Sequence, residues 1–171
     1  LQTYHTQYPL RQGAPIPEIR SRLNLTQAIY LKVLAKLSSS GVIVEDGQTL
    51  RLPDHSVTLT PELEEAASSY LKTLDQSPYS PPTDLPLDNE LLNNLIGQGK
   101  VIKVNDSVVF SVSAYQSMTV QIIDHIKANG SITVAEARTI FDSSRKYILP
   151  LMEHLDQQRI TRRQGDERVL R

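Results

Sequence analysis

The sequence has 171 residues, of which 39% are hydrophobic and 22% charged, and its formal net charge is −1. This composition is that of a soluble globular protein and excludes general disorder. The absence of cysteine excludes disulfides and thiolate metal sites, which fits a reducing cytoplasm. No apolar run approaches the ~18 residues of a membrane helix, so we expect a cytoplasmic protein without a membrane partner. Because the chain opens without Met, we expect it to be part of a longer protein.

The first 55 residues carry the pattern of helices followed by a small β-hairpin. The expected elements are a helix at 17–23, a helix at 27–38 and strands at 42–44 and 49–52. Thr26 can cap the second helix, Gly41 can end it, and Asp46 with Gly47 is the strongest hairpin-turn signal in the chain. We expect the core face of the second helix to consist of Ile29, Leu31, Val33, Leu34 and Leu37.

The next block, residues 56–112, repeats this order of elements. The expected elements are a helix from 61 to 75, a proline-rich loop at 77–86, a helix at 88–97 and strands at 101–104 and 108–112. Thr60 can cap the first of these helices, and Pro61 with the glutamates that follow it suits the first turn. Asn105 and Asp106 form the expected turn of a second hairpin.

The last block, residues 113–171, has the clearest pattern. The expected elements are helices at 115–128, 133–141 and 144–157 and strands at 160–163 and 168–170. Asn129 and Gly130 can end the first helix, and residues 131–133 can add a short strand beside the hairpin. Thr133 followed by Glu136 has the spacing of a capping box. Three helices and a hairpin in ~60 residues are typical of a winged helix.

The repeated order predicts a mostly α chain with small β-hairpins (α+β), built of tandem winged-helix domains at 1–55, 56–112 and 113–171. Lys and Arg number 6 against 4 Asp and Glu in the first domain, 3 against 8 in the second and 9 against 7 in the third. We therefore expect the middle domain to be an acidic spacer, and a polyanion to bind at one end of the chain.

Cations gather on the last predicted helix and the last predicted hairpin. With Ser143 or Ser144 as cap, Arg145 and Lys146 fall in the first helical turn, where free backbone N–H groups favour a phosphate. Two cations there oppose the helix dipole, and an anionic ligand would reverse that cost. The predicted RNA-binding residues are Ser144, Arg145, Lys146, Tyr147, Arg162, Arg163, Gly165 and Arg168.

Strand alternation puts Arg162 and Arg163 on opposite faces of the hairpin, so both cannot be buried. We expect the cations of the helix and of the hairpin to meet on one patch of surface. The alternative interpretation is a set of solvated charges that pair with neighbouring carboxylates, namely Glu153, Asp156, Asp166 and Glu167. Arg11, Arg20 and Arg22 are weaker candidates, and the segment around Arg11 favours a role in packing and turn formation.

Enzyme chemistry has no matching pattern in the sequence. The four histidines fall on different predicted elements without metal-ligand spacing, and neither a Gly-rich phosphate loop nor a nucleophile elbow occurs. We expect this chain to be no enzyme and to hold neither a metal nor a cofactor.

Several segments of the last block carry a family pattern. They are Thr-Val-Ala-Glu-Ala-Arg at 133–138, Ser-Arg-Lys-Tyr at 144–147, Pro-Leu-Met-Glu at 150–153, Thr-Arg-Arg-Gln-Gly-Asp at 161–166 and Arg-Val-Leu at 168–170. Together they resemble the last winged helix of bacterial selenocysteine-specific translation elongation factors. The first block, with Tyr4, Pro9 to Arg11 and Glu18 to Leu23, is similar to an earlier winged helix of that family. Asp142 and Ser143 depart from the Gly-Thr-like pair expected there.

The resemblance implies a module that binds the mRNA hairpin, or selenocysteine insertion element (SECIS), at which UGA is recoded. Arg145, Lys146, Arg162, Arg163 and Arg168 would contact the backbone and loop bases of that hairpin. The resemblance also implies that GTP and magnesium belong to an N-terminal part outside this chain. The ribosome and selenocysteinyl-tRNA would be partners through the full-length factor, and we expect a monomer.

Two other functions fit tandem winged helices. A DNA-binding regulator would need base-reading side chains along the last helix, where residues 149–152 are Leu, Pro, Leu and Met. A protein-interaction scaffold predicts no salt-dependent RNA binding.

Overall fold

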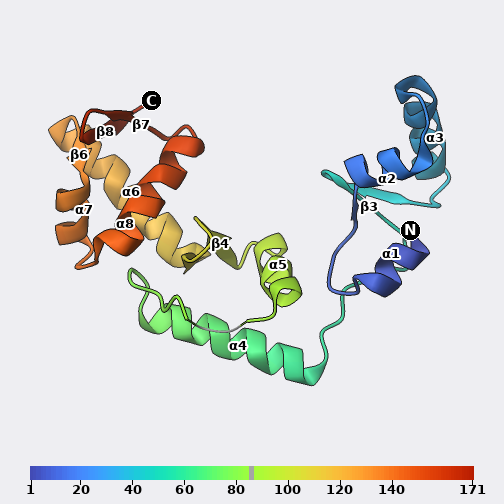
Figure 1. The fold of residues 1–171 in the computed structure, drawn as a ribbon, viewed down its shortest axis with the longest axis horizontal. Coiled ribbons are helices and arrows are strands. Elements are labelled where there is room, and N and C mark those ends of the chain that lie inside the picture. Colours follow the sequence, from blue (N-terminus) through green and yellow to red (C-terminus); the bar gives the residue numbers. More distant parts are fainter. Residues whose placement is uncertain (85–86) are drawn as a thin grey trace. The chain divides into compact units, whose positions relative to one another are not determined.

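The computed structural model describes residues 1–84 and 87–171 (Figure 1). They form two compact units, a first unit of Leu1–Glu64 with Asp88–Gly97 and a second unit of Glu65–Leu87 with Gln98–Arg171. Helices dominate and the strands form small antiparallel sheets, which confirms the predicted α+β class. The domain boundaries after residues 55 and 112 stay predictions. The loop prediction for residues 85 and 86 lies outside the described residues.

The first unit packs short helices around a three-stranded sheet. Its elements are α1 (Gln2–Gln7), β1 (Ala14–Pro15), α2 (Ile16–Leu23), α3 (Gln27–Ser39), β2 (Val44–Asp46), β3 (Thr49–Arg51) and α5 (Asn89–Gly97). The strand order is β1-β3-β2, with Ala14 opposite Leu50. The sequence pattern predicts α2, α3, α5 and the hairpin, but neither α1 nor β1.

The predicted core face of α3 is wrong for three of its five residues, because Ile29, Leu31 and Val33 are 49%, 54% and 38% exposed. Leu34 is buried as predicted, and Tyr30, one turn before it, is buried although the prediction omits it. The half-buried Leu37 continues the same stripe. The core of a small domain covers only one stripe of this helix, whereas the predicted face is wider than that stripe.

The first hairpin begins later than predicted. Gly41, with φ +72°, ends α3, and the N–H groups of Val42 and Ile43 both bond to the carbonyl of Leu37, at 3.0 and 3.4 Å. These two residues close the helix and cannot pair in the sheet, so the strand starts at Val44. The turn consists of two residues, of which Gly47 has φ +57°.

The second unit contains a complete three-helix fold with a hairpin. Its elements are most of α4 (Pro61–Gln76), then β4 (Val101–Lys103), β5 (Val109–Ser111), α6 (Val112–Asn129), β6 (Ile132–Thr133), α7 (Val134–Ile140), α8 (Arg145–Gln157), β7 (Thr161–Gln164) and β8 (Glu167–Leu170). Strands β4 and β5 pair with each other, and the other sheet has the order β6-β8-β7. The predicted strand at 131–133 is confirmed, since Ile132 pairs with Arg168.

A single core joins the β4–β5 hairpin to the helices that follow it. Phe110 is fully buried in one cluster with Met118 and Ile122 of α6 and with Ile148 and Leu151 of α8. Helix α6 starts directly after β5, where the Ser111 hydroxyl accepts a hydrogen bond from the N–H of Ala114 at 3.3 Å. The predicted helix start at 115 is therefore wrong by three residues, and the predicted strand end at 112 is wrong by one.

Candidate nucleic-acid interface

The turn from α7 to α8 sets the position of the first cations. At the end of α7, Ser143 N–H bonds to the Arg138 carbonyl at 3.0 Å and Asp142 N–H to the Thr139 carbonyl at 3.4 Å. This bonding is that of a Schellman motif, whose central residue takes a left-handed conformation. Asp142 has φ +45°, at the position where the family resemblance leads us to expect glycine. Aspartate tolerates this conformation better than most residues, so the turn is preserved.

The first turn of α8 contains two cations and no acidic residue. Ser144 is the N-cap, although its side chain makes no capping hydrogen bond, and the first turn contains no acidic residue. Ser144, Arg145 and Lys146 are exposed, and among the described residues neither cation has a salt bridge. The Lys146 ammonium lies 5.5 Å from the ring centroid of half-buried Tyr147. Within the described part of the chain, no ion pair therefore neutralises either cation of this turn, and its role in RNA binding stays a prediction.

A loop from the middle of the chain lies against this helix start. The Ser143 hydroxyl donates to the Tyr79 carbonyl at 2.7 Å and lies 3.0 Å from the Ser80 hydroxyl. The Lys146 ammonium donates to the Thr83 hydroxyl at 2.7 Å. Sequence reasoning misses Ser80 and Thr83, because no local pattern indicates a contact between residues 63 positions apart.

The β7–β8 hairpin, which we call the wing, presents two more arginines. Its turn consists of Gly165, with φ +65°, and Asp166. Arg162 and Arg163 are both exposed, on opposite faces of β7 as predicted. The Arg163 side chain folds over the turn, donating to the Gly165 carbonyl at 2.8 Å, with Asp166 at 3.7 Å. An exposed pair of this kind contributes little stability and leaves the guanidinium open to an anion.

The position of Arg168 corrects the prediction that this residue contacts RNA. Its side chain is only 3% exposed, and its Nε lies 3.3 Å from Asp156 Oδ2. The Thr161 hydroxyl donates to the other carboxylate oxygen of Asp156 at 2.6 Å. Both strands of the wing are thus tied to the last turn of α8 through one carboxylate. For Arg168 the alternative interpretation, pairing with a carboxylate, is the right one.

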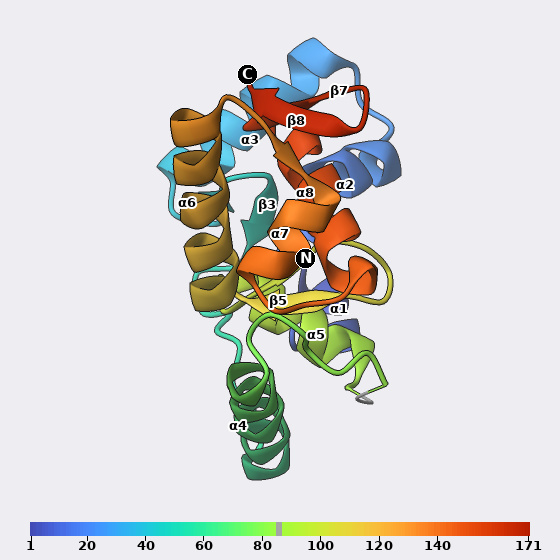
Figure 2. The ribbon, with the colours of Figure 1, turned by 90° about the vertical axis from the view of Figure 1, so that its left-hand side faces the viewer.

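The two groups of exposed cations do not meet on one patch. Arg145 begins α8 and Asp156 lies near its end, a separation of about 16 Å at the rise of an α-helix. Because Arg168 contacts Asp156 and pairs with Arg163, the wing lies at the far end of α8. Figures 1 and 2 both place β7 and β8 beyond the end of α8, away from its start. The prediction of a single patch is wrong, and the second unit carries two separate cationic positions.

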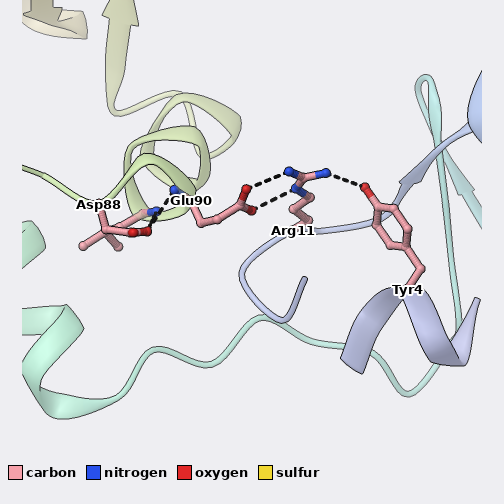
Figure 3. A network of polar contacts seen from close by, with 5 residues as sticks. Tyr4, Arg11, Asp88 and Glu90 are labelled. Carbon is pink, nitrogen blue, oxygen red and sulfur yellow. Dashed lines mark hydrogen bonds and ion pairs between the residues drawn. The ribbon is translucent and has the colours of Figure 1, made fainter. Parts of the chain in front are cut away.

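In the first unit, Arg11 has a structural role, as the sequence indicates (Figure 3). Its guanidinium makes two bonds to the Glu90 carboxylate, at 2.7 and 2.8 Å, and one of 2.9 Å to the Tyr4 hydroxyl. It also lies 4.0 Å from the ring centroid of Tyr8. These hydrogen bonds raise the pKa of Arg11 and lower the pKa of Glu90. The interaction anchors α5, whose start is capped by Asp88, and leaves no free charge for a ligand.

The same unit contains a stacked pair of histidines. The rings of His5 and His55 lie 3.6 Å apart, and the Leu52 N–H donates to Nε2 of the buried His5. Burial, and next the neighbouring His55, lower the pKa of His5. Within the described residues no cluster of His, Asp and Glu could hold a metal ion, and no described helix is long and apolar enough to cross a membrane.

Comparisons with known proteins bear on the family and the fold of this chain. Family models described as elongation factor SelB, winged helix, match residues 1–52 and 124–170, which together make up more than half of the chain. The selenocysteine-specific elongation factor of Desulfomicrobium baculatum is 26% identical over 185 aligned residues, covering 98% of this chain and 28% of the relative. The chain thus spans little more than a quarter of that relative.

Two solved structures share the fold. The crystal structure of the bacterial selenocysteine-specific elongation factor EF-Sec matches with TM-score 0.52 and 17% identity, over 97% of this chain and 27% of that one. The mRNA-binding domain of elongation factor SelB from E. coli, solved in complex with SECIS RNA, matches with TM-score 0.50 and 20% identity, over 66% of this chain and 99% of that one. The predicted tandem winged-helix fold is confirmed, and the chain belongs to the winged-helix part of the selenocysteine-specific elongation factors.

Proposed function

We propose that this chain is the mRNA-binding module of a selenocysteine-specific elongation factor, and that its ligand is a SECIS hairpin. The observation that carries the proposal is the start of α8, where exposed Arg145 and Lys146 lie beside free helix N–H groups with no acidic residue in the turn. Such a helix start favours a phosphate. The relative solved with SECIS RNA supports the choice of a folded RNA over other polyanions.

The RNA is held at two positions. Phosphates bind at the start of α8, and the wing arginines, Arg162 and Arg163, bind near the other end of that helix. Guanidinium groups can take phosphate oxygens in pairs or stack on unpaired bases, so the wing suits a hairpin loop. A folded hairpin presents its phosphates in a fixed arrangement and can reach both positions at once. Recognition then depends on the shape of the stem and on unstacked loop bases.

The rest of the activity lies outside this chain. In a full-length factor of the family, a separate part would bind GTP with magnesium and carry selenocysteinyl-tRNA, and the ribosome would be reached through that assembly in the cytoplasm. This chain would act as a non-catalytic RNA module. Its acidic middle segment, with 3 Lys and Arg against 8 Asp and Glu, would be repelled by RNA over most of its surface.

Titration with a SECIS hairpin, duplex DNA and a single strand at two salt concentrations tests the proposal. We expect the hairpin to bind most tightly, with an affinity that falls as salt rises. Arg145→Glu and Arg163→Glu should each weaken hairpin binding and reduce the salt slope by about one, with folding intact. Lys32→Glu, an exposed charge reversal on α3 in the first unit, is the matched control.

Two results would count against this function. Equal or tighter binding of duplex DNA would favour a DNA-binding regulator. Unchanged hairpin affinity in both Arg145→Glu and Arg163→Glu would remove the site, and no salt-dependent binding to any nucleic acid would favour a protein-interaction scaffold.

A further inference from the structure

The proline-rich loop before α5 contacts the α7–α8 turn and the start of α8 at several points, although a spacer needs no such contacts. Ser143 bonds to the Tyr79 carbonyl and lies within bonding distance of the Ser80 hydroxyl, while the Tyr79 ring lies 5.3 Å from that of Phe141. Pro81 is buried and fixes its own φ angle. The loop is thus anchored on the α7–α8 turn at several points, and Thr83 follows directly after them.

The contact between Thr83 and Lys146 joins the ammonium to a neutral partner. The ammonium donates to a neutral hydroxyl at 2.7 Å, rather than to a carboxylate. A carboxylate partner would neutralise the charge that a phosphate needs. A hydroxyl accepts one of the three ammonium donors and leaves the charge and two donors for another acceptor.

We propose that Thr83 is a positioning residue of the RNA site, which holds Lys146 ready for a phosphate at the start of α8. The proposal rests on the proposed function. A free lysine loses rotamer freedom when it binds a phosphate, and this loss weakens binding. Because the Thr83 hydroxyl already restricts the side chain, part of that loss occurs on folding and not on binding.

The proposal gives the acidic middle segment a second role. Residues 56–112 contain 3 Lys and Arg against 8 Asp and Glu, so RNA would be repelled by most of the segment. Residues 79–83, however, carry no charge and lie against the proposed binding site. Asp84, which follows, is exposed. A segment that separates two winged helices in the sequence would therefore also shape the RNA-binding surface.

A double-mutant cycle with the SECIS hairpin tests the role of Thr83. We expect Thr83→Val to weaken binding by about two- to tenfold, the range for immobilising one long side chain. Its salt slope should stay unchanged because no charge is removed, whereas Lys146→Met should lower the slope by about 0.7–0.9. Thr83→Ser, which keeps the hydroxyl, should bind as the unaltered chain does. Thr58→Val, at an exposed threonine of the first unit, is the matched control.

The effect of Thr83→Val should vanish in the Lys146→Met background, because the hydroxyl acts through that ammonium. An equal loss of affinity with and without Lys146, or no loss in the single variant, would overturn the role of Thr83 while leaving the RNA site in place. Failure of the unaltered chain to bind the hairpin would overturn both this role and the proposed function. Thermal melts of every variant separate loss of binding from loss of folding.

Discussion

Replacing the buried Arg168 is expected to destabilise the last winged helix without removing an RNA contact. Arg168→Met keeps an apolar stem of similar length but leaves the Asp156 carboxylate with Thr161 as its remaining partner in this network. Removing one member of a buried ion pair costs about 3–5 kcal/mol. The Asp156 side chain is 23% exposed and can gain water, so we expect a loss at or below the lower end of that range, about 2–3 kcal/mol.

The assay is urea denaturation monitored by the circular dichroism signal of the helices. The unfolding transition of the second unit is compared between variants. Arg168→Met/Asp156→Asn removes both charges while keeping an oxygen that can accept from Thr161. This double variant should recover at least half of the lost stability, because no unpaired charge remains near the core. The salt slope of hairpin binding should be unchanged in Arg168→Met, since a guanidinium that is buried and paired with Asp156 is not expected to bind a phosphate.

Three results would refute this reasoning. A loss of unfolding free energy below about 0.5 kcal/mol in Arg168→Met would be that of a surface charge, in conflict with the burial of Arg168. A double variant as unstable as the single one would show that the ion pair is not the source of the loss. A salt slope reduced as much as in Arg163→Glu would return Arg168 to the RNA contacts.

Arg159→Gly should raise the free energy of unfolding by about 0.5–1 kcal/mol in thermal or urea melts. Arg159 has φ +60°, and glycine relieves more backbone strain at this φ than its own flexibility costs. A destabilised variant would contradict this reasoning. Asp142→Gly should strengthen hairpin binding a few-fold by removing a carboxylate beside the start of α8, and Asp142→Asn should do the same if charge is the cause; unchanged affinity in both would be inconsistent with it. The pKa of His5 lies below its usual 6.5, so the unfolded chain binds a proton that the folded chain does not, and stability should be complete above about pH 6.5 and fall as the pH drops toward the folded pKa. Melts at about pH 8 and pH 5.5 should show a smaller fall for His5→Gln than for the unaltered chain, and equal falls would exclude His5 as a cause.

The last winged helix is the part of the fold that the sequence predicts best, because its signals are local. The capping box of Thr133 and Glu136 is present with both of its bonds, and Gly165 adopts the positive φ that a two-residue turn needs. Where several apolar residues compete for one face, local pattern is insufficient. On α3 the choice between Tyr30 and its neighbours Ile29 and Leu31 depends on tertiary packing, which no window of sequence contains.

Local sequence signals also predict some features of the binding site, whereas tertiary packing decides the others. The exposed cations of the α8 start follow from the cap at Ser144, and the opposite faces of Arg162 and Arg163 follow from strand alternation. The burial of Arg168 does not follow from the sequence. Strand alternation indicates which residues share a face, but it does not indicate which face an adjacent helix covers. The contact of Thr83 with Lys146 depends on a fold that brings distant segments together.

Hydrogen–deuterium exchange of the chain with and without a SECIS hairpin tests the central claim most directly. We expect slower exchange of the backbone amides at two positions, the first turn of α8 (residues 144–148) and the wing (residues 161–168), and little change in the first unit. Protection confined to the first unit, or absent from the start of α8, would contradict the proposed RNA-binding surface.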